Sequence, residues 1–296
     1  MKVVALPRSV TRPRVSRTRM AKEGLRQLIL YTVLAIGAIP FLLPLVFMVS
    51  TSLKPKGEVL LVPIRWIPSH IVWDNYYQAL FGYMPLYKYT WNTLQVVAAN
   101  LIGDVFVCAL VGYAFARVRA PGRTLLFALV LSTMMLPGHV VLVPTYVIFS
   151  AVHLRNTLWA LILPNLFAGN AFYIFLFRQF FQTIHPELAD AAKIDGCSQW
   201  GVFSRVYLPL SKPVLATVAV FSFFTHWNSF LWPLILIDTK ERLTLAVALK
   251  FFQGAHTTEF SLLMAASVFA LAPCLILFFV AQRYLIQGVV VTGVKG

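Results

Sequence analysis

The stretch PELADAAKIDG, residues 186–196, is a polar helix signal set between long apolar segments. Pro186 suits the first position of a helix, and the acids Glu187 and Asp190 follow close behind it, where the helix dipole favours negative charge. Gly196 falls where a left-handed residue ends many helices. A helix of about ten residues is therefore predicted. One face of it would fit closely into a groove of another protein, and that face consists of Leu188, Ala191, Ala192 and Asp195.

The composition is that of an integral membrane protein. Of the 296 residues, 59% are hydrophobic and 12% are charged, and the mean hydropathy is +0.77, whereas soluble domains carry about 25% charged residues. The three cysteines show no disulfide or metal spacing and are interpreted as packing residues. A net charge of +15 could suit nucleic acid. We expect no nucleic acid partner, because the basic residues are dispersed through loops and one tail, where membrane orientation explains them.

Six long intervals are almost free of charge, and only Asp104 interrupts one of them. Each interval exceeds the roughly 20 residues that a helix needs to cross the hydrocarbon core. Continuous apolar runs favour helices over the alternating strands of a barrel. We therefore expect an all-α membrane protein with six transmembrane helices, within residues 27–53, 89–116, 124–154, 156–177, 213–237 and 260–282.

The placement of Lys and Arg predicts the orientation. The N-terminal tail is rich in arginine and contains one acid, Glu23, which indicates a cytoplasmic N-terminus. Six crossings return the C-terminus to the same side, and most of the 25 basic residues then lie in the cytoplasm. A signal peptide is the alternative, but the interval 27–53 is too long for its apolar region.

The predicted organisation has three parts. A basic cytoplasmic tail covers residues 1–27, and a six-span domain covers 28–283, with a cytoplasmic loop at 179–212. A short cytoplasmic tail covers 284–296. In the outward loop before the last span, Gly254 permits a tight turn, so Gln253, Gly254 and His256 could project toward a bound solute or belong to a simple connector.

Prolines and polar residues within the spans indicate kinked helices around a pathway. Such breaks are tolerated where the freed backbone groups face neighbouring helices or a wet cavity. Asp104 lies near the middle of the second span, where it could relay ions or bond to another helix.

A candidate pathway face lies on the fifth span. Thr225, Asn228 and Trp232 recur at i, i+3 and i+7, which would place a hydroxyl, an amide and an indole on one side of a helix. These groups suit the recognition of sugars. The alternative is that Asn228 bonds to a neighbouring helix and Trp232 lies in the outer aromatic belt.

The sequence lacks the motifs of an enzyme. It contains no phosphate-binding G-x-x-x-x-G-K-[ST] loop, no H-E-x-x-H, no G-x-S-x-G and no clustered metal ligands. We therefore expect that this chain does not hydrolyse ATP, and that a partner bound at the polar helix supplies the energy.

The cytoplasmic loop resembles the EAA motif of binding-protein-dependent ABC importer permeases. The acid, the paired alanines, the glycine and the apolar-proline end of that motif are Asp190, Ala191, Ala192, Gly196 and Leu208-Pro209. Further matches, at 156–164, 227–234, 262–267 and 282–296, are similar to the six-span permease of maltose-type transporters. The resemblance runs from about residue 28 to the last residue. The sequence departs from the pattern at three positions, with Asp190 for the usual Glu, Cys197 after the glycine, and Ser229 for an acid.

The resemblance implies a type I ABC importer transmembrane domain in a prokaryotic inner membrane, surrounded by membrane lipids. Its implied partners are a second homologous permease, an ATPase subunit dimer and an external solute-binding protein. ATP and Mg would be held by the partners, with no cofactor on this chain. The cargo would be a sugar, an oligosaccharide or a glycerol phosphate, and the runners-up are an ion-coupled secondary transporter and a scaffold without a pathway. The implied ATPase-coupling residues are Glu187, Asp190, Ala191, Ala192, Asp195, Gly196 and Pro209, and the candidate contacts to the binding protein are Gln253, Gly254 and His256.

Overall fold

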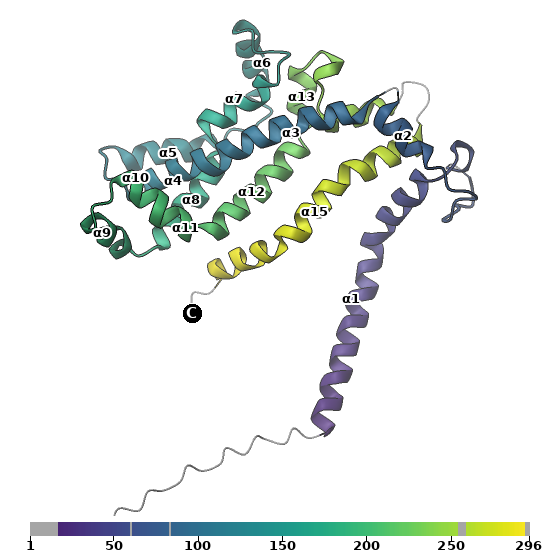
Figure 1. Cartoon of the computed structure of the whole chain (residues 1–296), viewed down its shortest axis with the longest axis horizontal. Coiled ribbons are helices and arrows are strands. Elements are labelled where there is room, and N and C mark those ends of the chain that lie inside the picture. The colour runs from purple at the N-terminus through teal and green to yellow at the C-terminus, as the bar shows by residue number, and fades with distance from the viewer. Residues whose placement is uncertain (1–16, 60, 83, 254–258, 294–296) are drawn as a thin grey trace, which may run out of the picture.

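The computed structural model describes residues 17–59, 61–82, 84–253 and 259–293, and its regular elements in these ranges are all helices. Four segments are long and apolar enough to cross a membrane. They are Glu23–Ser52 within α1 (Arg17–Ser52), Leu86–Arg117 across α3 (Leu86–Ile102), η2 (Gly103–Val107) and α4 (Cys108–Arg117), Trp159–Thr183 across α7 (Trp159–Ala168) and α8 (Ala171–Thr183), and Phe260–Gln282 within α15 (Phe260–Gly293). Figure 1 shows the middle two of these side by side along the bundle.

A fifth span is formed if a bent pair of segments is counted as one. The segments Gln199–Leu210 and Lys212–Trp227 meet at 79°. The first contains α10 (Gln199–Val202), η3 (Phe203–Tyr207) and α11 (Leu208–Leu210), and the second is α12 (Lys212–Trp227). The other short helices are η1 (Lys56–Glu58), α2 (Asp74–Phe81), α9 (Pro186–Ile194), α13 (Leu231–Leu236), η4 (Lys240–Arg242) and α14 (Leu245–Phe251).

The interval predicted as the third span forms two helices instead of one. α5 (Arg123–Thr133) and α6 (Leu142–Ala151) are separated by turns around Pro137, and neither is long enough to be counted as a span. Pro137 has no N–H to donate to the carbonyl of Thr133, so the helix ends there. By length and composition, four or five spans are therefore found among the described residues, where the charge-free intervals predicted six.

Two glycines allow the second span to pack closely against α7 and α8. A Cβ on Gly112 would lie 2.6 Å from the Cβ of Phe177, and one on Gly103 would lie 2.8 Å from the carbonyl oxygen of Asn165. Close helix approach through small residues is the usual means of packing in lipid, where burial of apolar surface supplies little force. The contact fixes one buried cluster around α4, α8 and η3 and a second around α3, α14 and α15.

α1 packs against α15 toward its C-terminal end, and the rest of it extends away from the bundle (Figure 1). None of its most apolar part is buried against the rest of the chain, and it leaves the other helices as it runs toward its N-terminal end (Figure 1). Its other end is anchored, because the amide of Asn75 donates to the carbonyls of Ser52 and Lys54, each at 2.9 Å. The long apolar side of α1 is thus available to lipid or to another subunit.

Packing at Gly112 gives a first prediction. Gly112→Ala should destabilise the protein by about 1–3 kcal/mol, because the added methyl overlaps Phe177 and one helix must shift. The thermal unfolding midpoint of the purified protein in detergent measures the effect. Gly37→Ala is the matched control, since nothing lies within 4 Å of its added methyl. An equal midpoint for both variants would contradict the close α4–α8 contact.

Candidate functional site

The polar stretch at 186–196 forms the predicted helix. α9 runs from Pro186 to Ile194, with the proline in its first turn, and Gly196 has a φ of +84°. The amide of Gly196 donates to the carbonyl of Lys193 at 3.0 Å, and the amide of Cys197 donates to that of Ala192 at 2.9 Å. Both the helix and its left-handed glycine end are confirmed.

Most of α9 is exposed. Ala189 is buried and Ala192 is half-buried, so this side rests on the bundle. The predicted coupling residues Glu187, Asp190, Ala191, Asp195 and Gly196 all lie on the open surface. The carboxylate of Asp190 forms an exposed ion pair with Lys193 at 3.2 Å. Large apolar side chains accompany these acids, with Leu188 47%, Ile194 87% and Trp200 63% exposed, a combination expected of a surface that another protein covers.

The sequence did not reveal how this loop is held. The Arg117 guanidinium, at the end of α4, donates from Nε and Nη2 to the carbonyl of Phe181 at 3.2 and 2.8 Å, and from Nη2 to the carbonyl of Ile184. These carbonyls lie at the C-terminal end of α8, where helical partners run out. The guanidinium also lies 5.4 Å from the ring centre of Tyr207. Arg117 therefore joins α4, α8 and η3 immediately before α9 begins.

Aromatic packing supports the same junction. Tyr113 contacts the rings of Phe181, Phe203 and Tyr207 at centroid distances of 6.1, 5.2 and 5.0 Å. Its hydroxyl donates to the side chain of Gln199 at 3.2 Å. Pro209, the proline of the motif, is exposed in α11, next to the 79° bend into α12. The segment that carries α9 is thus packed against α4 and α8 by aromatic contacts and hydrogen bonds.

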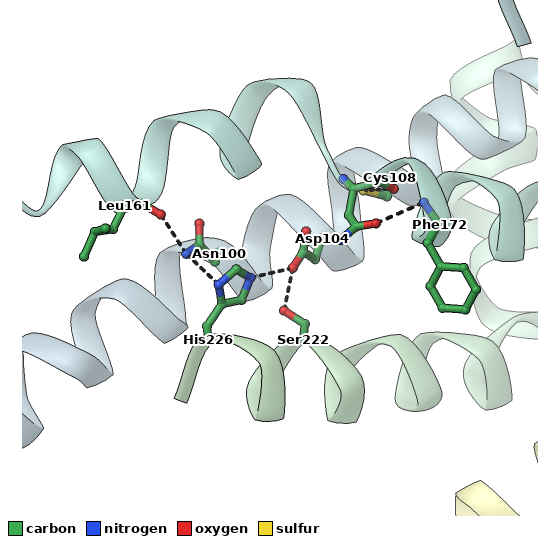
Figure 2. A network of polar contacts seen from close by, with 8 residues as sticks. Asn100, Asp104, Cys108, Leu161, Phe172, Ser222 and His226 are labelled. Carbon is green, nitrogen blue, oxygen red and sulfur yellow. Dashed lines mark hydrogen bonds and ion pairs between the residues drawn. The ribbon is translucent and has the colours of Figure 1, made fainter. Parts of the chain in front are cut away.

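Deeper in the bundle, Asp104 is the centre of a polar network (Figure 2). It lies in the π-helical turn η2 and is fully buried. Its Oδ2 accepts from the hydroxyl of Ser222 at 2.7 Å and lies 2.9 Å from Nε2 of His226. Asn100 donates to the carbonyl of Leu161 at 3.1 Å and lies 3.2 Å from Nδ1 of His226. The network joins α3, α7 and α12, which supports the helix-bonding interpretation of Asp104.

Of the two neutral tautomers of His226, these contacts favour the one with its proton on Nε2. The amide nitrogen of Asn100 faces both the carbonyl of Leu161 and Nδ1 of His226, so Nδ1 acts as an acceptor in this arrangement. Nε2 then carries the proton and donates it to Asp104. Both ring nitrogens of His226 are engaged within the bundle.

A cavity of about 330 Å³ adjoins this network. It lies between α3, α6, α7, α12 and α13, and its wall contains no Lys, Arg, Asp or Glu among the described residues. His226 is the titratable group in the wall, and neutral polar groups surround it. They are Thr145, Asn165, Asn170, Thr225, Ser229 and Thr244, with the indole of Trp232 beside them.

The single helical face predicted from Thr225, Asn228 and Trp232 is not formed. α12 ends at Trp227, and Pro233 cannot donate to the carbonyl of Ser229, so one helix does not continue through this region. Thr225 and Trp232 still line the cavity together. Asn228 donates back to the carbonyl of Phe224 at 2.9 Å and lines a separate hollow of about 180 Å³. The prediction of one shared face was therefore wrong for Asn228.

The loop between α14 and α15 is described only in part. Gln253 accepts a hydrogen bond from Lys250 at 2.7 Å, whereas Gly254 and His256 lie outside the described residues. The neighbouring segment is held by Asn156, whose φ is +60°. Its side-chain oxygen accepts from the backbone amides of Asp238 and Thr239 at 3.1 and 3.0 Å.

Comparison with known proteins shows to which family this chain is similar. Residues 108–291 match the family described as "Binding-protein-dependent transport system inner membrane component". The chain belongs to this family. It is therefore the membrane permease component of an ABC importer, in a multi-pass inner-membrane family whose members are transport subunits.

Curated relatives match over most of their length. The chain is 33% identical to the arabinooligosaccharides transport system permease protein AraQ of Bacillus subtilis, over 86% of this chain and 91% of the relative. It is 27% identical to the lactose transport system permease protein LacG of Rhizobium radiobacter, over 90% and 96%. It is 32% identical to the sn-glycerol-3-phosphate transport system permease protein UgpE of Escherichia coli, over 88% and 94%.

Solved structures share the fold. One is a chain of a bacterial ABC transporter that imports the acidic polysaccharide alginate, with a TM-score of 0.77 and 24% identity, covering 92% of this chain and 99% of that one. The other belongs to an alginate transporter in complex with its pentasaccharide-bound periplasmic protein, with a TM-score of 0.65 and 19% identity, covering 90% and 96%. The type I importer fold expected from the sequence is thus confirmed.

The Asp104 network gives a second prediction. Asp104→Asn and Ser222→Ala should show a coupling energy of about 0.5–2 kcal/mol in a double-mutant cycle on thermal stability, because their side chains bond to each other between two helices. Ser267→Ala is the control, since its hydroxyl bonds within its own helix, to Leu263. Additive effects of the Asp104 and Ser222 changes would contradict the network.

Proposed function

We propose that this chain takes up an uncharged carbohydrate, which an external binding protein delivers and ATP hydrolysis on partner subunits drives inward. The observation that carries the proposal is the connection between two sites at opposite ends of one helix. α8 ends at the Arg117 anchor beside α9, and it begins at Asn170, which lines the cavity. A movement of α9 is therefore transmitted to the wall of the cavity.

The exposed surface of α9 supports docking of an ATPase. Leu188 and Ile194 supply apolar contact area, and Glu187 and Asp190 supply charge for a basic partner. In this proposal Ala191, Asp195, Gly196 and Pro209 shape the same contact, while Ala192 packs α9 onto the bundle. Two ATPase subunits hold the ATP and Mg, and a second homologous permease completes the pathway. Closure of the ATPases would rock the helices between states open to either side.

The proposed cargo is based on the residues of the cavity wall and on the solutes for which the relatives are named. Relatives are named for the transport of arabinooligosaccharides, lactose and sn-glycerol-3-phosphate, which span neutral and anionic solutes. An anion would find no Lys or Arg in the described cavity wall, and the carboxylate of Asp104 lies behind His226. Hydroxyls and amides around an indole instead suit a neutral sugar. The volume of about 330 Å³ lies at the lower end for ligand pockets, which favours a short saccharide.

An ion-coupled secondary transporter is less well supported. Such a mechanism needs a group that exchanges protons with the pathway. Asp104 is fully buried, and both nitrogens of His226 are bonded to bundle residues. Uptake should therefore require ATP and persist in the presence of ionophores.

The proposed orientation places α9 and both termini in the cytoplasm of a prokaryotic cell. The outward loop containing Gln253, Gly254 and His256 then faces the binding protein. The dense basic content on the α9 side supports this assignment.

A third prediction tests the docking helix. Gly196→Val should lower ATP-dependent uptake at least fivefold while the protein level in the membrane persists, because a branched residue is strained at a φ of +84° and displaces the end of α9. Uptake into vesicles containing the full complex measures this. Gly24→Val is the control, since its added side chain meets nothing within 4 Å. Unchanged uptake and ATPase co-purification would reject the docking role.

A fourth prediction tests the cavity. Thr225→Val should lower uptake or change sugar preference, with basal ATP turnover retained, because it removes a hydroxyl from the wall. Asn228→Ala should have little effect, since its amide bonds within α12 and lines the other hollow. Thr217→Val is the matched control on the same helix, where the hydroxyl bonds to Pro213. A stronger effect from Asn228→Ala than from Thr225→Val would place the pathway elsewhere.

A further inference from the structure

Three arginines gather where residues 118–122 connect α4 to α5, at the end of the bundle that also carries α9 (Figure 1). Arg119 is exposed on this turn. Arg123 begins α5 and donates to the carbonyl of Val118 at 3.0 Å. Arg178 reaches over from α8, with its guanidinium carbon 4.1 Å from the ring centre of Phe127.

Within the described residues, no acidic side chain forms an ion pair with this cluster. Arg123 is near enough to Arg178 for the two cations to repel each other. The Nε of Arg178 is buried and has no hydrogen-bond partner. The sequence contains no Asp or Glu from residue 105 to residue 186, and the ion pairs found in the described ranges do not include these arginines. An external anion would therefore relieve a repulsion that folding leaves in place.

The surroundings of the cluster combine a hollow with an apolar surface. An open hollow of about 670 Å³ is lined by residues 119–125. Directly beyond it on α5, Leu125, Leu126 and Leu129 are 66%, 54% and 55% exposed. A soluble phosphate or an acidic peptide would use the arginines but leave these leucines uncovered. A phospholipid matches both parts, because its phosphate is anionic and its acyl chains are apolar.

We propose that the α4–α5 turn is a binding site for an anionic phospholipid. Its phosphate lies in the hollow between Arg119 and Arg123, and Arg178 lies near Arg123 outside the lining of the hollow. Its acyl chains run along Leu125, Leu126 and Leu129. The site lies in the cytoplasmic leaflet, and this location rests on the orientation proposed for α9. Basic pockets of membrane proteins bind anionic headgroups in that leaflet.

The test is lipid binding to the purified full-length chain, measured by native mass spectrometry with phosphatidylglycerol and with phosphatidylcholine. Arg119→Gln/Arg123→Gln should weaken phosphatidylglycerol binding about thirtyfold and Arg119→Gln alone about fivefold, since each basic residue adds to the attraction of an anionic lipid. Binding of phosphatidylcholine should change less than twofold. Arg205→Gln is the matched control, because Arg205 is exposed on η3, away from the hollow, and the charge change is the same.

Several results would overturn the proposal. Wild-type affinity in the double variant would do so, as would an equal loss in Arg205→Gln. Complete displacement of the lipid by millimolar inorganic phosphate would show a site for soluble anions. Loss of ATPase co-purification with unchanged lipid binding would assign the arginines to a protein partner. If the double variant does not fold, Arg119→Gln alone tests the proposal. Its folding should be unaffected, because Arg119 forms no hydrogen bond or ion pair in the described part of the chain.

The orientation is tested separately. Ala120→Cys should resist a membrane-impermeant thiol reagent in intact cells and react after the membrane is opened. Reaction from outside would reject the proposed orientation and leaflet, whereas lipid binding in detergent would be unaffected. The two failures are therefore distinguishable.

Discussion

The hydrogen bonds from Arg117 to the end of α8 are the contact on which the functional arrangement depends. Carbonyls at a helix C-terminus have no helical donors, and a cation is favoured beside them. Arg117 meets both needs with one planar group and also packs on Tyr207. Arg117 consequently links α4, α8 and η3 directly before α9. At about 20 Å, α8 is long enough to connect this junction with the cavity wall at Asn170.

One π-helical turn lies in the buried polar network, and the other lies next to α9. η2 carries Asp104 in the buried network, and η3 carries Phe203 and Tyr207 under the coupling loop. A π turn inserts a residue into the helix and redirects side chains, and such turns are frequent at functional sites. In this chain the redirected groups hold neighbouring helices together. In the described cavity wall, His226 is the residue that contacts Asp104, and it lies between that carboxylate and the cavity.

The sequence predicted best what local chemistry determines. Pro186 and Gly196 specify the beginning and end of α9 by themselves, and the structure agrees. The EAA-like residues also led to the correct family. The Arg117 anchor could not be foreseen, because it joins residues that are more than 60 positions apart and no pattern in either helix predicts the meeting.

The sequence predicted kinks at the prolines within the spans, but not that they would divide an interval into separate short helices. Pro137 and Pro233 each remove a backbone donor, so the intervals 124–154 and 213–237 break into shorter helices. Hydropathy measures transfer into lipid and does not register this loss. The i, i+3, i+7 spacing therefore gave the wrong position for Asn228, which lies just past the end of α12. Thr225 and Trp232 nevertheless line the same cavity, one before and one after the break in the helix. The intervals were thus located correctly, but their internal geometry was not.

The exposure of α1 has a consequence for how this helix is held. None of its most apolar part is buried against the rest of the chain, and lipid tails cover apolar side chains as well as another helix does. The position of α1 therefore depends on the bilayer along most of its length and on the contacts near Ser52 at one end. A medium with a thinner apolar layer than the bilayer would leave part of this helix uncovered and would change its tilt before it disturbed the packing of α4 against α8.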